Sequence, residues 1–434
     1  MTSPGSRIDR QPKTHRHVCR NSCETPTRLI QKGKFVRAFG QEAEVELQTQ
    51  RRLRQELLDF IDNRSTDYAS DVMRVDPAVY YDPDYLKEEF EVVFGDNPVI
   101  VAHHSELTEP GDFLTVDVAG TPLIVVRQDD GSVKAFANAC RHRGAKVELA
   151  ESGRRRMFAC PYHKWCYSRD GGIRSIPFDD GFVGLDRNEV GLVEYPAVEY
   201  AGFIWSKAKP GTELDIPAYI GSELEKDVVA SKVADAKLYQ KRTFHLDMNW
   251  KVVMDGFTDA YHLQFVHPET VGPFFHTNIY KCDIYDKNWR MTVARRGVVD
   301  FRDSDLTDGE FPKYAIAGLQ FYPGNIIARA PAHFEVWAIR PNPEDLSKCV
   351  VTLWFMVDEL PVSDKAKRFR EKNWEIVLKA VEGEDWVVAK TVTDVLPHSN
   401  VPDLFFGRNE KATQHLHQTI ARDIEAARAK EATA

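Results

Sequence analysis

The stretch CRHRGAKVELAESGRRRMFACPYH, residues 140–163, decides the fold of the first half of this 434-residue chain. It contains a C-x-H pair, Cys140 and His142, and a C-x2-H pair, Cys160 and His163, with 17 residues between the two pairs. Each pair adjoins a short apolar run bounded by turn residues, which is typical of a β-strand. Two loops beside neighbouring strands can direct four ligands toward one point, so the stretch predicts a metal centre within an all-β module.

The order of the ligands distinguishes a zinc ion from an iron–sulfur cluster. Two thiolates and two imidazoles also suit a tetrahedral zinc ion. A zinc finger, however, has two closely spaced cysteines followed by two closely spaced histidines, whereas each loop here provides one of each. This favours a two-iron cluster with both thiolates on one iron and both imidazoles on the other, the Rieske arrangement. We therefore expect Cys140, His142, Cys160 and His163 to bind a [2Fe-2S] cluster, with a zinc-binding structural protein as the weaker alternative.

Residues 249–270, NWKVVMDGFTDAYHLQFVHPET, carry a second set of candidate ligands. His262 and His267 are five residues apart, which is about 500° of rotation on a straight helix and would splay them. Pro268 ends regular helix at this point, and we expect this to let His267 return beside His262. Two histidines and one carboxylate form the facial triad that binds Fe(II) and leaves coordination positions open for O2.

The sequence offers two sources for the carboxylate of this triad. Asp259 lies three residues before His262, a position from which it can bond the imidazole instead of the metal. Glu384 and Asp385 lie far along the chain on a predicted helix and are the best remote candidates.

Together the two motifs resemble the α (terminal oxygenase) subunits of Rieske non-haem iron oxygenases, the aromatic-ring-hydroxylating dioxygenase family, over roughly residues 75–400. The resemblance implies that His262, His267 and Asp385 hold a mononuclear Fe(II). It also implies a catalytic role for Asp259, as the carboxylate that joins a cluster histidine of one subunit to an iron histidine of its neighbour in a head-to-tail homotrimer. The implied fold is α+β, with an all-β Rieske domain inserted in a helix-grip-like catalytic domain that has a mixed antiparallel sheet and helices.

The potential of the cluster is expected to be low. High-potential Rieske proteins have a further cysteine in each loop, joined as a disulfide, but Ala145 and Tyr162 stand at those positions here. The hydroxyl groups of Tyr167 and Ser168 are candidates for hydrogen bonds that tune the potential.

The pattern along the chain predicts four parts. Residues 1–38 have a net charge of +7, which leaves −16 for the rest, and we expect a disordered tail there. N-terminal helices of the catalytic domain follow over 39–97, the Rieske domain over 98–207, and the mononuclear-iron catalytic domain over 208–434. Apolar periodicity predicts helices over 44–63, 84–94, 249–266 and 363–394.

Composition excludes several classes of protein. The net charge of −9 provides no basic face for nucleic acid, and no window approaches the roughly 18 apolar residues of a membrane span. Seven cysteines without framework spacing indicate a reducing compartment. We therefore expect a cytoplasmic protein that binds neither nucleic acid nor membrane.

The expected function is that of a terminal oxygenase, which uses O2 and two electrons from NAD(P)H to hydroxylate an aromatic or aromatic-acid substrate. The chain has no G-x-G-x-x-G fingerprint, so the electrons come from a separate reductase, directly or through a ferredoxin. We expect the trimer to consist of α subunits alone or to include a small β subunit. The alternative is a monooxygenase or demethylase that acts on an alkyl or quaternary ammonium substrate, and a pure electron carrier would need no second metal motif.

Two groups of side chains are candidates for the substrate pocket. A carboxylated substrate requires a pocket cation, and an apolar substrate or a quaternary amine requires aromatic rings. The arginine candidates are Arg290, Arg329 and Arg340, and the aromatic candidates are Phe274, Phe275, Trp289, Phe321, Tyr322, Trp337 and Phe355.

Overall fold

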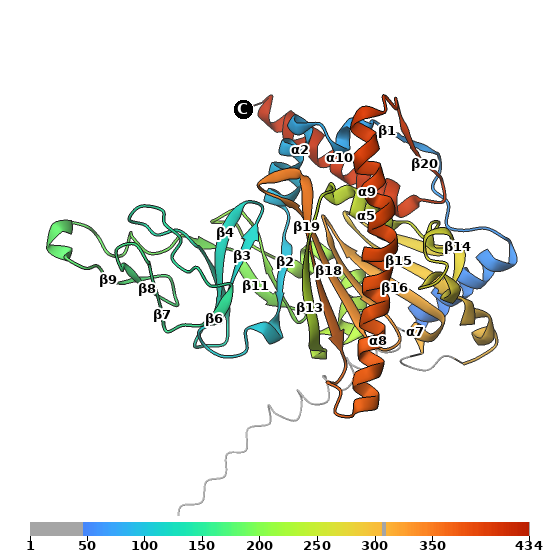
Figure 1. Ribbon diagram of the computed structural model, residues 1–434, viewed down its shortest axis with the longest axis horizontal. Coiled ribbons are helices and arrows are strands. Elements are labelled where there is room, and N and C mark those ends of the chain that lie inside the picture. Colours follow the sequence, from blue (N-terminus) through green and yellow to red (C-terminus); the bar gives the residue numbers. More distant parts are fainter. Residues whose placement is uncertain (1–46, 306–309, 434) are drawn as a thin grey trace, which may run out of the picture. The chain divides into compact units, whose positions relative to one another are not determined.

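The computed structural model describes residues 47–305 and 310–433 (Figure 1). The tail expected over residues 1–38 lies outside these ranges. The first predicted helix is confirmed over 47–62, and the second over α2 (Pro83–Glu89), which continues as a π-helical turn, η2 (Phe90–Phe94).

The middle of the chain folds as short antiparallel strands, as the alternating apolar runs predict. A five-stranded sheet has the order β10-β5-β4-β3-β6, and two three-stranded sheets have the orders β11-β12-β2 and β7-β8-β9. A hairpin around Asp130 and Gly131 joins β4 to β5, and Gly131 has a positive φ of 85° at its turn. The strands are β2 (Val99–His103), β3 (Asp112–Val118), β4 (Thr121–Arg127), β5 (Val133–Ala137), β6 (Ser152–Arg154), β7 (Met157–Ala159), β8 (Cys166–Ser168), β9 (Ile173–Ser175), β10 (Glu194–Tyr195), β11 (Ala197–Tyr200) and β12 (Phe203–Ser206).

The second half of the chain is built on a seven-stranded antiparallel sheet with the order β13-β19-β18-β17-β16-β15-β14. Its strands are β13 (Lys237–Leu246), β14 (Phe275–Tyr285), β15 (Asn288–Arg295), β16 (Ala315–Phe321), β17 (Asn325–Arg329), β18 (Phe334–Asn342) and β19 (Asp345–Val357). The helices are α3 (Ile216–Ile220), α4 (Ser222–Ser231), α5 (Trp250–Thr258), α6 (Leu263–Val266), α7 (Phe311–Tyr314), α8 (Asp364–Ala380), α9 (Trp386–Val395) and α10 (Lys411–Glu431). A last pair of strands, β1 (Met73–Val75) and β20 (Leu404–Phe406), forms a two-stranded ribbon. The all-β module and this helix-covered antiparallel sheet make the fold α+β, as expected.

Helices cover both faces of the large sheet, because alternate residues of each strand point to opposite faces. On β16, Leu319 and Phe321 point to one face and share a buried cluster with Ile220 and Leu224 of α3 and α4. The other face packs against α5, α8 and α10, and Figure 1 shows α8 and α9 running across the sheet. The site described below lies on this second face.

A buried ion pair fixes the start of α5. Lys251 donates to both carboxylate oxygens of Glu89, at 2.7 and 2.6 Å, and the indole Nε1 of Trp250 donates to Oε1 at 2.6 Å. Asn249 caps the helix by accepting the backbone N–H of Lys251. The N-W-K run of the sequence therefore anchors the helix that leads to the candidate iron ligands.

Candidate iron centres and substrate pocket

The two candidate histidine ligands lie at the ends of one short helix. The single helix predicted over 249–266 is wrong, because α5 ends at Thr258 and Asp259 is extended, with φ −115° and ψ 123°. Helix α6 then begins after His262 and ends before His267. Pro268 is therefore not the only interruption, and the break at Asp259 re-aims His262 before the helix resumes.

The carboxylate that joins these histidines is Asp385. It lies at the end of a π-helical turn, η8 (Val381–Asp385), between α8 and α9. Its Oδ1 is 2.9 Å from Nε2 of His267 and 3.5 Å from Nε2 of His262. Within residues 47–305 and 310–433, these are the only three His, Cys, Asp or Glu side chains whose ligand atoms all lie within 4.8 Å of one another. One turn of π-helix often marks a functional site, and this one positions a ligand.

Glu384, the alternative ligand, contacts the same histidine from behind. Its Oε2 is 2.7 Å from Nδ1 of His267, and the hydroxyl of Thr270 donates to the same oxygen. Glu384 therefore fixes the tautomer that leaves Nε2 of His267 free for a metal. Asp259 does the same for His262, with Oδ2 at 3.3 Å from Nδ1.

The electrostatics of this triad favour a bound cation. Burial opposes a charged imidazole at His267, but the hydrogen bonds and negative charges of Asp385 and Glu384 outweigh it and raise its pKa. A site that stabilises positive charge on this ring also stabilises a divalent metal ion in its place. Two neutral imidazoles and one carboxylate fit mononuclear iron with open coordination positions.

The effect of Glu384 is testable at the metal itself. We expect Glu384→Gln to weaken iron binding by about 10- to 100-fold, because the charge that orients and polarises His267 is lost. The measurement is iron retained after dialysis against graded chelator. Glu382→Gln is the matched control, since Glu382 lies on the same turn but pairs with Arg242 at 2.7 Å on the surface. Equal iron loss from both variants would contradict the role of Glu384.

The four candidate ligands of the Rieske cluster lie on two loops with the same hydrogen-bond pattern. The N–H of Cys140 donates to Ala145 O and that of Cys160 to Trp165 O, at 2.8 and 2.9 Å. The residue four positions after each cysteine has a positive φ, 72° at Gly144 and 59° at Lys164. The sequence thus builds two matching ligand loops, each with one cysteine and one histidine.

The contacts around these loops fit a two-iron cluster. The histidine rings of His142 and His163 lie 4.6 Å apart between centroids, and Nδ1 of His142 is buried without a partner. A Rieske cluster has both imidazoles on one iron and both thiolates on the other, and the adjacent histidine rings match this arrangement. Burial and the neighbouring Cys140 raise the pKa of the Cys160 thiol, so a bound cation would favour its thiolate form.

Of the two hydroxyl groups expected beside the cluster sulfurs, only that of Tyr167 contacts one. Its Oη lies 3.2 Å from Cys140 Sγ and accepts the N–H of Arg141 at 3.0 Å, so its own hydrogen is left for the sulfur. The hydroxyl of Ser168 bonds Asp170 and the carbonyl of Gly172 instead.

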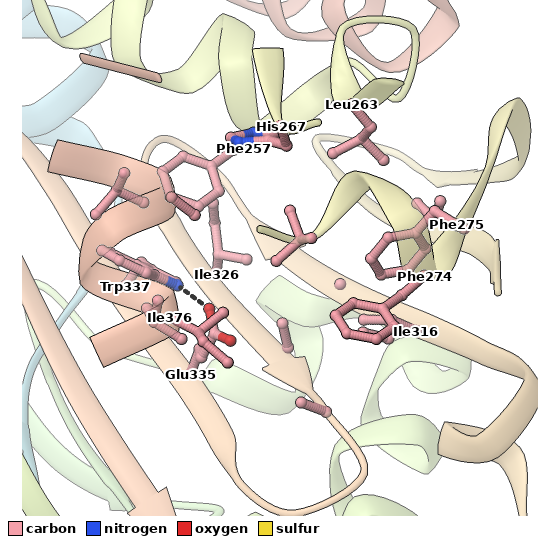
Figure 2. A pocket seen from close by; sticks show the side chains of 18 of the residues that line it. Phe257, Leu263, His267, Phe274, Phe275, Ile316, Ile326, Glu335, Trp337 and Ile376 are labelled. Carbon is pink, nitrogen blue, oxygen red and sulfur yellow. Dashed lines mark hydrogen bonds between the residues drawn. The ribbon is translucent and has the colours of Figure 1, made fainter. Parts of the chain in front are cut away.

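A cavity of about 450 Å³ opens beside the histidine–aspartate triad (Figure 2). Its floor is the face of the large sheet that packs against α5, α8 and α10, where four strands each contribute alternate residues. Helix α8 forms its roof. Asp259, His262, His267 and Asp385 line one end. The floor residues are Met291, Val293 and Arg295 of β15, Ile316, Gly318 and Gln320 of β16, Ile326 and Ala328 of β17 followed by Ala330, and His333 ahead of Glu335 and Trp337 of β18.

The predicted aromatic lining is correct in part. Phe274, Phe275 and Trp337 line the cavity, together with Phe257 and Phe369, which the sequence did not distinguish from core residues. The remaining four candidates, Trp289, Phe321, Tyr322 and Phe355, are buried in packing clusters and do not line it. Only Phe321 points to the opposite face of the sheet. Trp289 and Phe355 stand opposite the cavity residues Gln320 and Glu335 on neighbouring strands, on the same face, and are buried by other side chains.

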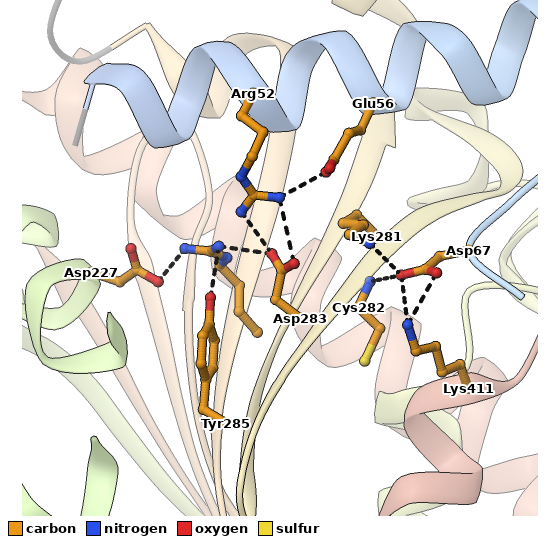
Figure 3. A network of polar contacts seen from close by, with 10 residues as sticks. Arg52, Glu56, Asp67, Asp227, Lys281, Cys282, Asp283, Tyr285 and Lys411 are labelled. Atoms are coloured by element: carbon orange, nitrogen blue, oxygen red, sulfur yellow. Dashed lines mark hydrogen bonds and ion pairs between the residues drawn. The ribbon is translucent and has the colours of Figure 1, made fainter. Parts of the chain in front are cut away.

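None of the three candidate arginines lines the cavity. Arg290 pairs with Asp283 at 2.7 Å and with Asp227, and Figure 3 shows the surrounding network with Arg52. Arg329 pairs with Asp358, and Arg340 is buried against the carbonyl of Ile100. The arginine of the cavity is Arg295, whose guanidinium lies over the rings of Phe274 and Phe275.

Comparisons with known proteins agree with this geometry. Residues 97–194 match the family described as the Rieske [2Fe-2S] domain, and residues 233–426 match the ring hydroxylating alpha subunit (catalytic domain). The chain is 31% identical to the chlorobenzene dioxygenase subunit alpha of Cupriavidus sp. (strain PS12), over 44% of this chain and 43% of that protein. It is 28% identical to the carnitine monooxygenase oxygenase subunit of Acinetobacter baumannii, over 56% of this chain and 66% of that one. The matched stretches therefore span about half to two thirds of these relatives.

Solved structures share the fold. The quaternary ammonium Rieske monooxygenase CntA in complex with L-carnitine has a TM-score of 0.67 at 20% identity, over 82% of this chain and 96% of that chain. Naphthalene 1,2-dioxygenase from Rhodococcus sp. bound to indole has a TM-score of 0.66 at 21% identity, over 86% and 98%.

The chain carries a Rieske domain followed by the catalytic domain of ring-hydroxylating α subunits. It belongs to the Rieske oxygenase family, whose cofactors are a [2Fe-2S] cluster and a mononuclear iron. No helix in the described part of the chain is long and apolar enough to cross a membrane.

Proposed function

We propose that this protein is the terminal oxygenase of a Rieske oxygenase system, which inserts oxygen from O2 into an organic substrate. The observation that carries the proposal is the placement of His262, His267 and Asp385 at one end of a largely apolar cavity of about 450 Å³. Cys140, His142, Cys160 and His163 would hold the cluster, and the triad would hold iron. When bound, the cluster supplies electrons and the iron supplies the site of O2 activation.

The side chains around the triad prepare it for this chemistry. Asp259 and Glu384 hold the Nδ1 hydrogens of His262 and His267, so that both Nε2 atoms face the metal position. Phe257, Leu263 and Val381 line the cavity and exclude water from the reacting region. Positioning of the substrate against the triad then falls to the cavity floor.

Electron supply and assembly complete the proposal. A reductase that oxidises NAD(P)H, with or without a ferredoxin, would reduce the cluster, because this chain lacks the G-x-G-x-x-G fingerprint of a dinucleotide site. We further propose a head-to-tail homotrimer, with or without a small β subunit, in which Asp259 bridges to a cluster histidine of the adjacent subunit. The side chain of Asp259 is 17% exposed and so remains accessible to such a neighbour.

The first substrate class is an aromatic compound or aromatic acid. Phenylalanine rings provide apolar walls that favour a planar substrate. Arg295 adds a positive charge, and no carboxylate in residues 47–305 or 310–433 forms an ion pair with it. A substrate carboxylate would supply that partner. Burial lowers the pKa of Arg295, and no acidic neighbour raises it again.

The second substrate class is a cationic amine, and Glu335 is the observation that favours it. This carboxylate lines the same cavity and accepts a hydrogen bond from the indole of Trp337 at 3.3 Å. A carboxylate beside an indole suits a positively charged nitrogen. The reaction would then be monooxygenation or demethylation at a carbon near that nitrogen.

Product mass under isotopically heavy O2 tests the proposed function. Enzyme loaded with both metals and supplied with a surrogate reductase is given aromatic acids, aromatic hydrocarbons and quaternary amines. Two labelled oxygens on a ring establish dihydroxylation, and one labelled oxygen or a labelled aldehyde with a demethylated product establishes monooxygenation. Unlabelled product from every substrate would refute the proposal.

The cavity floor offers a second test through Gly318. A Cβ atom there would meet its nearest neighbours, Gln320 Nε2 and Met291 O, at 3.9 Å, so the position is open toward the cavity. We expect Gly318→Leu to fill the floor and raise KM by about tenfold or more. Gly318→Ala is the matched control and should leave KM near the wild-type value, with Tm unchanged or slightly higher in both variants. An unchanged KM in Gly318→Leu would place the substrate elsewhere.

A further inference from the structure

Glu335 lies at the head of a trough in the cavity floor. Its neighbour across β17 is Ala328, the next residue across β16 is Gly318, and the row ends at Met291 of β15. Ala328 and Gly318 have the smallest side chains possible, so the floor is lowest between Glu335 and Met291. Figure 2 shows the Glu335 carboxylate pointing into the cavity, with His267 on the far side.

The contacts of Glu335 leave its negative charge in place. Nε2 of His333 lies 3.0 Å from Oε1, and Nε1 of Trp337 donates to Oε2. Nδ1 of His333 is buried and has no partner. Because a carboxylate only accepts hydrogen bonds, Nε2 of His333 is the donor in its contact. Two ring N–H groups therefore hold the carboxylate, and neither comes from a lysine or an arginine.

No lysine or arginine compensates this charge. Among the residues that the structure describes, His333 is the only ion-pair partner of Glu335, whose side chain is 23% exposed to the cavity. Each carboxylate oxygen accepts one hydrogen bond and can accept another. An uncompensated carboxylate in an apolar cavity is costly to keep, and a positively charged ligand is the partner that removes this cost.

We propose that Glu335 selects a substrate that carries a positively charged nitrogen, held against its carboxylate. This rests on the proposed function and names the substrate class of the same site. Trp337 is 1% exposed and packs against Phe257 with ring centroids 5.0 Å apart, so its part is to hold the carboxylate through the indole N–H. Both a protonated amine and a quaternary ammonium group have the required charge, and they differ in their N–H donors.

Paired probes separate charge from shape. Benzyltrimethylammonium is compared with neopentylbenzene, its neutral isostere, and benzylammonium with ethylbenzene, by equilibrium binding to the metal-loaded protein. We expect at least one cation to bind about tenfold or more tightly than its neutral partner, as for other hydrogen bonds and ion pairs to a charged group. Preference for the first cation identifies a quaternary nitrogen, and preference for the second identifies an amine with N–H donors.

Substitutions assign the preference to Glu335. In Glu335→Gln the preference should fall to near onefold, while affinity for the neutral probes is retained and shows that the cavity is intact. Glu335→Asp keeps the charge and should keep the preference. Glu359→Gln removes a charge from an exposed position and should change nothing.

Two results would overturn the inference. One is a wild-type preference near onefold, including the case in which neither cation binds, and the other is a preference that persists in Glu335→Gln. Labelled oxygen in any product alongside such a result refutes the inference and leaves the proposed function standing. A clear, Glu335-dependent preference with no labelled product from any substrate refutes the proposed function instead.

Discussion

Asp385→Ala is expected to lose the mononuclear iron and to lower turnover by at least about 100-fold, while the Rieske cluster stays bound. Asp385 is the only carboxylate in the described chain that contacts Nε2 of both histidines, at 3.5 Å from His262 and 2.9 Å from His267. Its removal leaves two neutral ligands and no charge to hold a divalent ion. The cluster loops belong to other strands, so their absorption should not change.

Metal analysis and visible absorption of the same sample check this prediction. The control is Asp394→Ala, since Asp394 lies on the adjoining helix α9 and pairs with Lys390 on the surface. This variant should keep both the cluster iron and the mononuclear iron, and it should keep full turnover. Stoichiometric mononuclear iron in Asp385→Ala would disprove the assignment, and iron loss from Glu384→Ala alone would transfer the ligand role to Glu384.

The adjacent acids Glu384 and Asp385 show where sequence reasoning reaches its limit. Both were candidates for the metal ligand. On a helix of uniform pitch, neighbouring residues point in different directions, so the sequence provided no reason to expect that both would contact one histidine. The π-helical turn adds a residue to the turn and directs the two carboxylates to opposite nitrogens of His267. No residue pattern in this stretch announces a π-turn, so their roles follow from the fold.

The histidine pair and the cluster loops were more predictable. Ligand type and spacing are local properties, and the C-x-H and C-x2-H loops adopt matching turns that depend on few distant contacts. The α+β fold followed from the resemblance and from alternation in the strands. The break at Asp259 was missed because Asp and Ala are acceptable in a helix interior.

The charged residues of the pocket could not be predicted from the sequence. Arg290, Arg295 and Arg329 all lie on or at the end of strands of one sheet, and the choice among them depends on strand register and on distant acids. Arg290 points to the face where Asp227 and Asp283 lie, whereas Arg295 points to the cavity. A shift of one residue reverses the face of every side chain. Glu335 was overlooked for the same reason.

Asp259→Asn should retain both metals, because the 3.3 Å contact of Asp259 with His262 is weaker than the 2.7 Å contact of Glu384 with His267, and it should lower turnover by about 100-fold or more. Asp259 holds Nδ1 of His262, and in the proposed trimer its carboxylate also accepts a hydrogen bond from a cluster histidine of the adjacent subunit. Asparagine keeps the size but replaces one acceptor oxygen by an NH2 donor, so it cannot present a separate acceptor oxygen to each of the two imidazoles. The fold should be unaffected, because the side chain lies at a helix break and outside the buried core.

The rate at which the reduced cluster is reoxidised by O2, with substrate present, isolates this effect from substrate binding. It should fall with turnover in Asp259→Asn, since electrons then reach the iron slowly, while iron and cluster content stay at wild-type levels. Asp255→Asn is the matched control on the preceding helix, α5. Asp255 also contacts a histidine, His417, at 2.9 Å, but it serves the packing of α10 and Tyr80. That variant should lower Tm and leave the reoxidation rate unchanged. A bridging carboxylate has to act on the rate while both metal sites remain filled. Loss of iron from Asp259→Asn would therefore make Asp259 a support for His262 alone, and full turnover would exclude Asp259 from electron transfer.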